Sequence, residues 1–140
     1  MKLNPYLMFN GQCEAAFKFY EQCLGGKITT MMPYGESPEP LMTDQLTPEW
    51  RNKIMHVSLT IGDQELMGSD SPPEYDEEAK GFSVSISLND PIEGERIFNT
   101  LAENGTVRMP FQQTFWAYRF GMLVDRFGIP WMINCDQVAE

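Results

Sequence analysis

The chain has little of what disulfide-bonded, exported or membrane-bound proteins depend on. Its 140 residues include three cysteines, Cys13, Cys23 and Cys135, which are odd in number and unclustered. This pattern favours free thiols in a reducing compartment over disulfides or a zinc cage. No apolar run approaches the roughly 18–20 residues that a membrane-spanning helix needs. The first residues also lack the apolar stretch of a signal peptide, so we expect a cytoplasmic protein without a membrane partner.

Basic residues and nucleotide-binding motifs are also scarce. Ten Lys and Arg face twenty Asp and Glu, which gives a formal net charge of −10. A surface this acidic repels phosphate backbones, so we expect no nucleic-acid partner. The sequence has no Gly-rich phosphate loop, no GxSxG elbow, no HExxH and no CxxC pair, and these motifs mark nucleotide, nucleophile and metal sites. No cofactor is predicted.

What the chain does have is a repeated order of periodic segments. The first half predicts a strand, a helix and three strands, and the second half predicts the same order. The predicted ranges are 6–9, 12–24, 27–32, 54–61 and 64–69, then 82–88, a helix opened by Asn89-Asp90-Pro91, 106–109, 115–124 and 131–135. The helix-ending glycines Gly26 and Gly105 lie 79 positions apart.

This repeat predicts an α+β fold of two βαβββ modules, with curved mixed sheets and the helices outside. We expect one domain over residues 1–140, with module 1 at about 1–70, a linker at about 70–81 and module 2 at about 82–138. Such modules have sheet edges that need cover, so a homodimer is expected. Whether the modules pair within one chain or between two is left open.

Two of the predicted strands alternate between an apolar face and a small polar face. The polar positions are His56, Ser58 and Thr60 in the first half, and Ser83, Ser85 and Ser87 in the second. If both sheets curve, these side chains line a concave cleft and offer hydrogen bonds to a ligand. The alternative is a solvated sheet face that binds nothing.

Two further features are candidates for a site. His56 is the only histidine, and an imidazole suits a metal ligand or a general base as well as a plain polar strand position. In the aromatic stretch 111–121, Trp116, Tyr118 and Phe120 are expected to share one strand face. Such a wall stacks on a flat ligand, packs as core or forms a dimer interface, and both faces of this strand carry large side chains.

The segment Phe19-Tyr20-Glu21-Gln22-Cys23-Leu24-Gly25-Gly26 resembles the FYxxxLGG helix end of the vicinal-oxygen-chelate superfamily, which includes glyoxalase I and the bleomycin-resistance proteins. The second half is similar to its PhnB-like branch, also labelled a 3-demethylubiquinone-9 3-methyltransferase-like domain. The segments that carry this similarity are Gln113-Thr114-Phe115-Trp116, Phe120-Gly121, Asp125-Arg126-Phe127-Gly128 and Pro130-Trp131-Met132-Ile133-Asn134. The resemblance covers about Pro5 to Asn134 and implies the glyoxalase/bleomycin-resistance fold.

The resemblance also implies where metal ligands would lie, at the first and last strands of each module. Counting along this chain places those positions at Asn4 or Pro5, at Phe82 or Ser83, and at Met67 and Met132. These side chains do not form a site of oxygen and nitrogen donors, so no metal is predicted.

We therefore expect a metal-independent small-molecule binding protein of unknown ligand. Its candidate ligand-binding residues are His56, Ser58, Thr60, Ser83, Ser85, Trp116 and Tyr118. The alternative is a divalent-metal-dependent lyase, isomerase or dioxygenase-like enzyme that uses His56 as ligand or base, assisted by Glu65 or Asp125.

Overall fold

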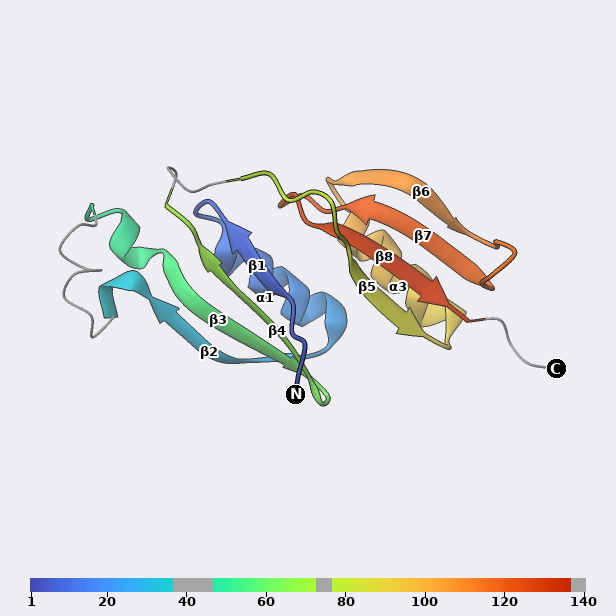
Figure 1. Ribbon diagram of the computed structural model, residues 1–140, viewed down its shortest axis with the longest axis horizontal. Helices are drawn as coiled ribbons and strands as arrows, with labels where there is room; N and C mark the ends of the chain where they lie inside the picture. The colour runs from blue at the N-terminus through green and yellow to red at the C-terminus, as the bar shows by residue number, and fades with distance from the viewer. Residues whose placement is uncertain (37–46, 73–76, 137–140) are drawn as a thin grey trace. The chain divides into compact units, whose positions relative to one another are not determined.

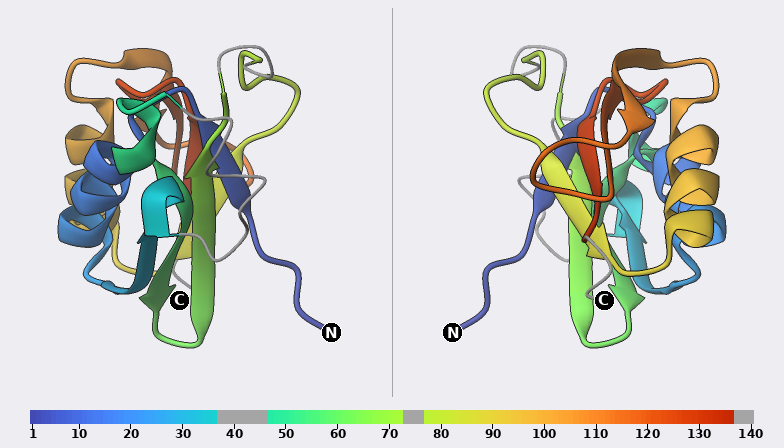
Figure 2. Two further views of the ribbon diagram at one scale, coloured as in Figure 1. Left: turned by 90° about the vertical axis from the view of Figure 1, so that its left-hand side faces the viewer. Right: turned by 90° about the vertical axis from the view of Figure 1, so that its right-hand side faces the viewer.

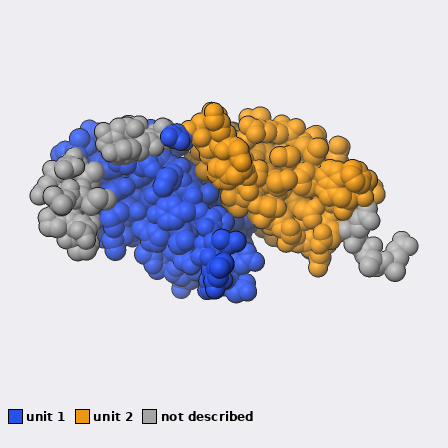
Figure 3. Space-filling view, viewed as in Figure 1, with its two compact units in different colours: residues 1–77 blue, residues 78–140 orange. Residues whose placement is uncertain are grey.

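The computed structural model describes residues 1–36, 47–72 and 77–136. The chain forms two compact units, Met1–Glu77 and Glu78–Glu140, which are coloured separately in Figure 3. Within these residues, each unit has one four-stranded mixed sheet and one α-helix on it (Figure 1). The predicted α+β fold with two βαβββ modules is therefore confirmed. Within the described residues, neither α-helix is long and apolar enough to cross a bilayer.

The first unit is a sheet with one face covered by helix α1. Its order is β1-β4-β3-β2, in which β1 is parallel to β4 and the other neighbours are antiparallel. The elements are β1 (Tyr6–Phe9), α1 (Cys13–Leu24), β2 (Lys27–Pro33), the 3-10 turns Tyr34–Glu36 and Trp50–Asn52, β3 (Ile54–Ile61) and β4 (Gln64–Asp70). The predicted strands 54–61 and 64–69 correspond to β3 and β4, which pair as an antiparallel hairpin with Gly62 in the turn at φ +62°.

Helix α1 forms because its apolar residues recur at helical spacing and bury one stripe. The buried positions are Cys13, Ala16, Phe17, Tyr20 and Cys23. The helix ends at Gly25, which takes the left-handed conformation at φ +74°. A Cβ on Gly68 of β4 would lie 2.6 Å from Phe17 Cε2, so a glycine is needed where the helix meets the sheet.

The second unit repeats this topology. Its order is β5-β8-β7-β6, and β5 is parallel to β8 as β1 is to β4. The elements are β5 (Val84–Leu88), α3 (Pro91–Ala102), β6 (Thr106–Gln112), β7 (Arg119–Val124) and β8 (Pro130–Cys135). The predicted start of α3 is confirmed, because the Asp90 carboxylate accepts the N–H of Ile92 and Pro91 occupies the first turn. Figure 2 shows each helix against one face of its sheet.

Two strand predictions are wrong at their starts. The expected strand 82–88 begins at Val84, so Ser83 lies outside it. The expected strand 115–124 is shortened to β7, which begins at Arg119. Thr114 is the physical reason, because its hydroxyl accepts the Ala117 N–H while its own N–H donates to the Ala117 carbonyl. These two bonds close a turn over the Phe115–Trp116 segment, so Trp116, Tyr118 and Phe120 do not share one strand face.

Candidate functional site

One face of the first sheet is turned away from α1 and carries the candidate binding residues of this unit. We call it the distal face. Strand register defines it, because directly paired residues project to the same side. One row runs Thr30, Ser58, Met67, Tyr6 across the four strands, and the next joins Met32 to His56 and Ser69 to Met8. The residues of the distal face are Tyr6, Met8, Lys27, Thr30, Met32, His56, Ser58, Thr60, Glu65, Met67 and Ser69. The predicted set His56, Ser58 and Thr60 therefore lies on one face, opposite the buried Val57 and Leu59.

Tyr6 and His56 form an aromatic pair on the distal face. Their rings stack with centroids 5.9 Å apart and an interplanar angle of 28°. The Tyr6 hydroxyl lies 3.3 Å from His56 Nδ1, within hydrogen-bond distance. Tyr6 keeps 42 % of its surface exposed and Met8, its neighbour on the same face of β1, keeps 63 %. Half-exposed rings and thioethers on a sheet provide flat, polarisable surface for a ligand.

Ser58 and Glu65 form the polar part of the distal face. The Ser58 hydroxyl donates a hydrogen bond to Glu65 Oε1, across the β3–β4 pair. Ser58 is buried and Glu65 is half-buried. Among the described residues, no ion pair includes Glu65. A carboxylate is thus held in place on this face by a neutral partner.

Asp70 organises the end of the sheet on the other side, beneath α1. Its carboxylate accepts the N–H groups of Gly11 at 2.8 Å, Cys13 at 3.0 Å and Ile54 at 2.9 Å. Gln12 makes no side-chain cap, so Asp70 supplies the negative charge that a helix N-terminus favours. Burial, and then the Asp70 charge, raise the pKa of the Cys13 thiol. These groups fix the framework that carries the site.

Tyr34 lies beside Asp70 and has a structural role. Its hydroxyl donates to the Asp70 carbonyl at 2.7 Å. Burial, with a smaller effect of the Asp70 charge, raises the pKa of Tyr34. A buried phenol held neutral in this way closes the end of the sheet.

The second sheet has a corresponding face turned away from α3. There Ser85 pairs with Met132, and Ser87 pairs with Asn134, which in turn pairs with Phe120. The Trp116 ring packs edge-on against Phe120, with centroids 5.3 Å apart, and Trp116 is 49 % exposed.

The other two candidates of the second unit lie outside its strands. Ser83 immediately precedes β5. The guanidinium of Arg119 lies 4.4 Å from the centroid of the Tyr118 ring. The Tyr118 backbone N–H is bonded to the Cys135 carbonyl, which fixes the segment at the start of β7.

Asp125, which the enzyme alternative predicts to assist His56, lies in the turn between β7 and β8. It is 3 % exposed. Its carboxylate accepts N–H groups from Phe127, Ile129 and the Trp131 indole, at 2.8, 3.0 and 2.8 Å. These bonds give it a structural function in the second unit.

Sequence reasoning missed Tyr6, and it considered Met67 only as a position where a metal ligand would be expected. The segment Tyr6–Phe9 is apolar throughout, so it has no alternation that could mark an exposed face. Only strand pairing brings Tyr6 beside His56, 50 positions away. The paired positions on β1 and β4 are Tyr6 and Met67, and those on β5 and β8 are Ser85 and Met132. Pairing thus places Tyr6 and Ser85, and not Pro5 and Ser83, beside these methionines.

These pairs do not fit the divalent metal that the fold suggests. Phenol, hydroxyl and thioether groups are poor ligands for a hard cation. Within residues 1–36, 47–72 and 77–136, no three His, Cys, Asp or Glu side chains come together in a set able to hold a metal ion. The donor set therefore offers no basis for a reaction step through such a metal.

Comparison with known proteins gives one matching family and several relatives. Residues 1–134 match the family described as 3-demethylubiquinone-9 3-methyltransferase. Protein YjdN of Escherichia coli (strain K12) is 36 % identical over 141 residues, covering 96 % of this chain and 95 % of YjdN. The crystal structure of protein PA1353 from Pseudomonas aeruginosa is 48 % identical, covers 99 % of both chains and superposes with a TM-score of 0.88. A PhnB protein from Bacillus cereus is 24 % identical, with a TM-score of 0.78, and the match covers 96 % of this chain and 99 % of that one.

More distant structures share the fold alone. A glyoxalase/bleomycin resistance protein/dioxygenase family enzyme from Burkholderia phytofirmans is 12 % identical, with a TM-score of 0.64 and coverage of 96 % and 97 %. The fosfomycin resistance protein FosX from Listeria monocytogenes is 7 % identical, with a TM-score of 0.66 and coverage of 99 % and 94 %.

Proposed function

The chain belongs to the 3-demethylubiquinone-9 3-methyltransferase-like family, the PhnB-like branch of the vicinal-oxygen-chelate superfamily, and from this we propose that it binds a small organic molecule without a metal. The observation that carries the proposal is the Tyr6–His56 pair, stacked and hydrogen-bonded on a sheet face with exposed Met8 beside it. A ligand that lies on this face covers apolar surface and reaches polar groups within the same sheet. His56, Ser58 and Thr60 provide those polar groups.

The second unit contributes a binding face of its own in this proposal. Trp116 offers an exposed ring anchored by Phe120, and Ser85 lies on the same side of the sheet. Ser83 and Tyr118 complete the proposed set at the ends of β5 and β7. In this proposal the protein acts in the cytoplasm. It forms a homodimer, because β1, β2, β5 and β6 are the outer strands of their sheets and outer strands need cover. Light scattering at a mass twice that of the chain is the expected result, and a monomer mass contradicts dimerisation.

The donor set favours binding over metal chemistry. The distal face has one imidazole and one carboxylate, and each already has a partner within the sheet, Tyr6 and Ser58. A metal-dependent lyase, isomerase or dioxygenase would need further oxygen or nitrogen donors beside His56. In the metal-independent proposal, His56 and Glu65 keep the partners that the structure gives them.

A ligand screen with methionine reporters tests the proposal. Protein labelled with 13C at its methionine methyls and treated with EDTA is exposed to a library of flat organic compounds. We expect hits to shift Met8, Met32 and Met67, while Met31, which neighbours Met32 in β2 but pairs with Val57 on the helix side, stays unchanged. Tyr6→Ala should weaken every such hit, and Ile92→Ala, which removes an exposed side chain on α3, should weaken none. Hits that require an added divalent metal would contradict the proposal.

A further inference from the structure

Glu65 is the one carboxylate among the described residues of the distal face, and the binding proposal leaves it unused. It is half-buried, and Ser58 holds its Oε1 in place. Its neighbours on the face are Met67, two positions along β4, and Thr60, directly across β3. No ion pair among the described residues neutralises it. A fixed, partly desolvated carboxylate without a counter-ion attracts a cation more strongly than a fully solvated one does.

Two other observations favour the same sign of charge. Tyr6 pairs directly with Met67, which places its ring diagonally from Glu65 on the same face. The electron-rich face of a phenol ring attracts cations, and the thioethers of Met8 and Met67 add polarisable surface beside it. The chain as a whole also carries a net charge of −10, so its long-range field concentrates cations at the surface.

One cation of the chain competes for this position. Lys27 pairs with Thr60, so it lies in the row that contains Glu65, with the width of β3 between them. Lys27 is exposed, and no ion pair joins it to Glu65. Lys27 is the basic residue nearest to Glu65 in the strand register. Its positive charge weakens the preference of this face for a cationic ligand, but Lys27 forms no ion pair with Glu65.

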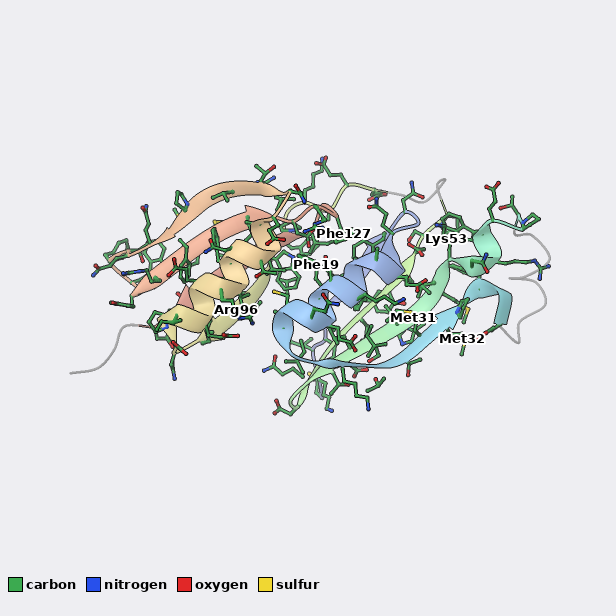
Figure 4. All side chains as sticks on the ribbon, turned by 180° about the vertical axis from the view of Figure 1, so that it is seen from behind. Phe19, Met31, Met32, Lys53, Arg96 and Phe127 are labelled. Carbon is green, nitrogen blue, oxygen red and sulfur yellow. The ribbon has the colours of Figure 1, made fainter. Side chains whose placement is uncertain are left out.

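Resting on the proposed function, we infer that the ligand of the distal face is an organic cation: a flat, largely apolar molecule with a protonated amine. Glu65 is its counter-ion, Tyr6 and His56 carry its flat part, and Met8 and Met67 contact its apolar edge. Figure 4 shows the side chains of the unit, with Met31 and Met32 of β2 labelled.

A matched pair of probes isolates the charge. Tryptamine and tryptophol share an indole and a two-carbon arm, and differ in ending with an ammonium or a hydroxyl group. Binding of each is followed at the methyls of Met8, Met32 and Met67 in EDTA-treated protein at pH 8. We expect tryptamine to bind about fivefold more tightly than tryptophol, the upper range for a half-exposed ion pair.

Variants then assign the effect to Glu65. Glu65→Gln keeps an acceptor for the Ser58 hydroxyl and removes the charge, so we expect the preference for tryptamine to fall to about onefold. Glu95→Gln, the same change at an exposed position of α3, should leave it near fivefold. Circular dichroism of both variants checks that the fold is kept.

The outcomes separate this inference from the function on which it rests. Equal binding of tryptamine and tryptophol, or a preference that survives Glu65→Gln, overturns the cation and leaves a binding face for neutral molecules. Methionine shifts at Met31 instead of the distal-face methionines, or no shifts with either probe, overturn both.

Discussion

Replacing Asp70 by asparagine tests the framework on which the site rests. The carboxylate is 1 % exposed and accepts three backbone N–H groups, those of Gly11 and Cys13 through Oδ1 and that of Ile54 through Oδ2. In the Asp70→Asn variant the single amide oxygen can still serve Gly11 and Cys13. The amide NH2 group then faces the Ile54 N–H, so two donors meet at a distance of about 2.9 Å.

The magnitude follows from what is lost. A hydrogen bond to a charged group contributes about 1.5–3 kcal/mol, and a buried donor left unsatisfied costs about 1–3 kcal/mol. Because the two terms overlap, we expect Asp70→Asn to lower the free energy of unfolding by about 3 kcal/mol. The matched control is Asp63→Asn in the exposed β3–β4 turn, for which a change within about 0.5 kcal/mol is expected.

Urea unfolding followed by circular dichroism measures both variants. A loss for Asp70→Asn no larger than that of Asp63→Asn would refute the idea that this carboxylate joins the start of α1 to β3 and β4. A loss of the expected size, with a fluorescence transition that coincides, would support it.

Four further predictions concern packing, thiol reactivity, the pH dependence of stability and the surface. Gly68→Ala should lower the free energy of unfolding by about 1–3 kcal/mol, because its Cβ would lie 2.6 Å from Phe17 Cε2 and 2.7 Å from the Leu7 carbonyl oxygen; wild-type stability in a urea titration would contradict this. All three cysteines are buried, and burial raises the pKa of Cys13 and of Cys135, so Ellman's reagent should detect no thiol at pH 8 in the native chain and all three after denaturation. The same shifts mean that the unfolded thiols lose their protons first, so stability should fall as pH rises above about 9, and a flat urea midpoint from pH 8 to 10 would argue against it. Arg126→Ala should cost under about 1 kcal/mol by urea titration, because its ion pair with Glu103 is long, at 3.4 Å, and exposed; a larger loss would be inconsistent with a surface pair.

Much of the fold could be predicted because local pattern and tertiary packing agree. The strand Tyr6–Phe9 and the strand Ile54–Ile61 have the predicted limits, and the stripe of α1 is buried as its spacing indicates. The strand at 115–124 failed because a side-chain bond from Thr114 closes a turn that aromatic β-propensity conceals. Local preference was overridden there by one hydroxyl.

The site was less accessible to prediction from the sequence. Alternation placed His56, Ser58 and Thr60 together, since residues of one strand two positions apart share a face. Tyr6 could not be found in this way, because its contact with His56 depends on β4 lying between β1 and β3. The Ser58–Glu65 hydrogen bond likewise needs the hairpin register before it can be inferred. The site depends on contacts between residues of different strands, and these contacts cannot be predicted from a single sequence.

The central claim is that the distal face binds an organic ligand without a metal. Calorimetric titration of a screening hit into EDTA-treated protein, repeated with Mn2+, Ni2+ or Zn2+ added, tests it most directly, with Tyr6→Ala as the negative control. The account predicts the same dissociation constant with and without each metal, and at least tenfold weaker binding to Tyr6→Ala. Binding that occurs only when metal is present, or that is unchanged in Tyr6→Ala, would contradict it.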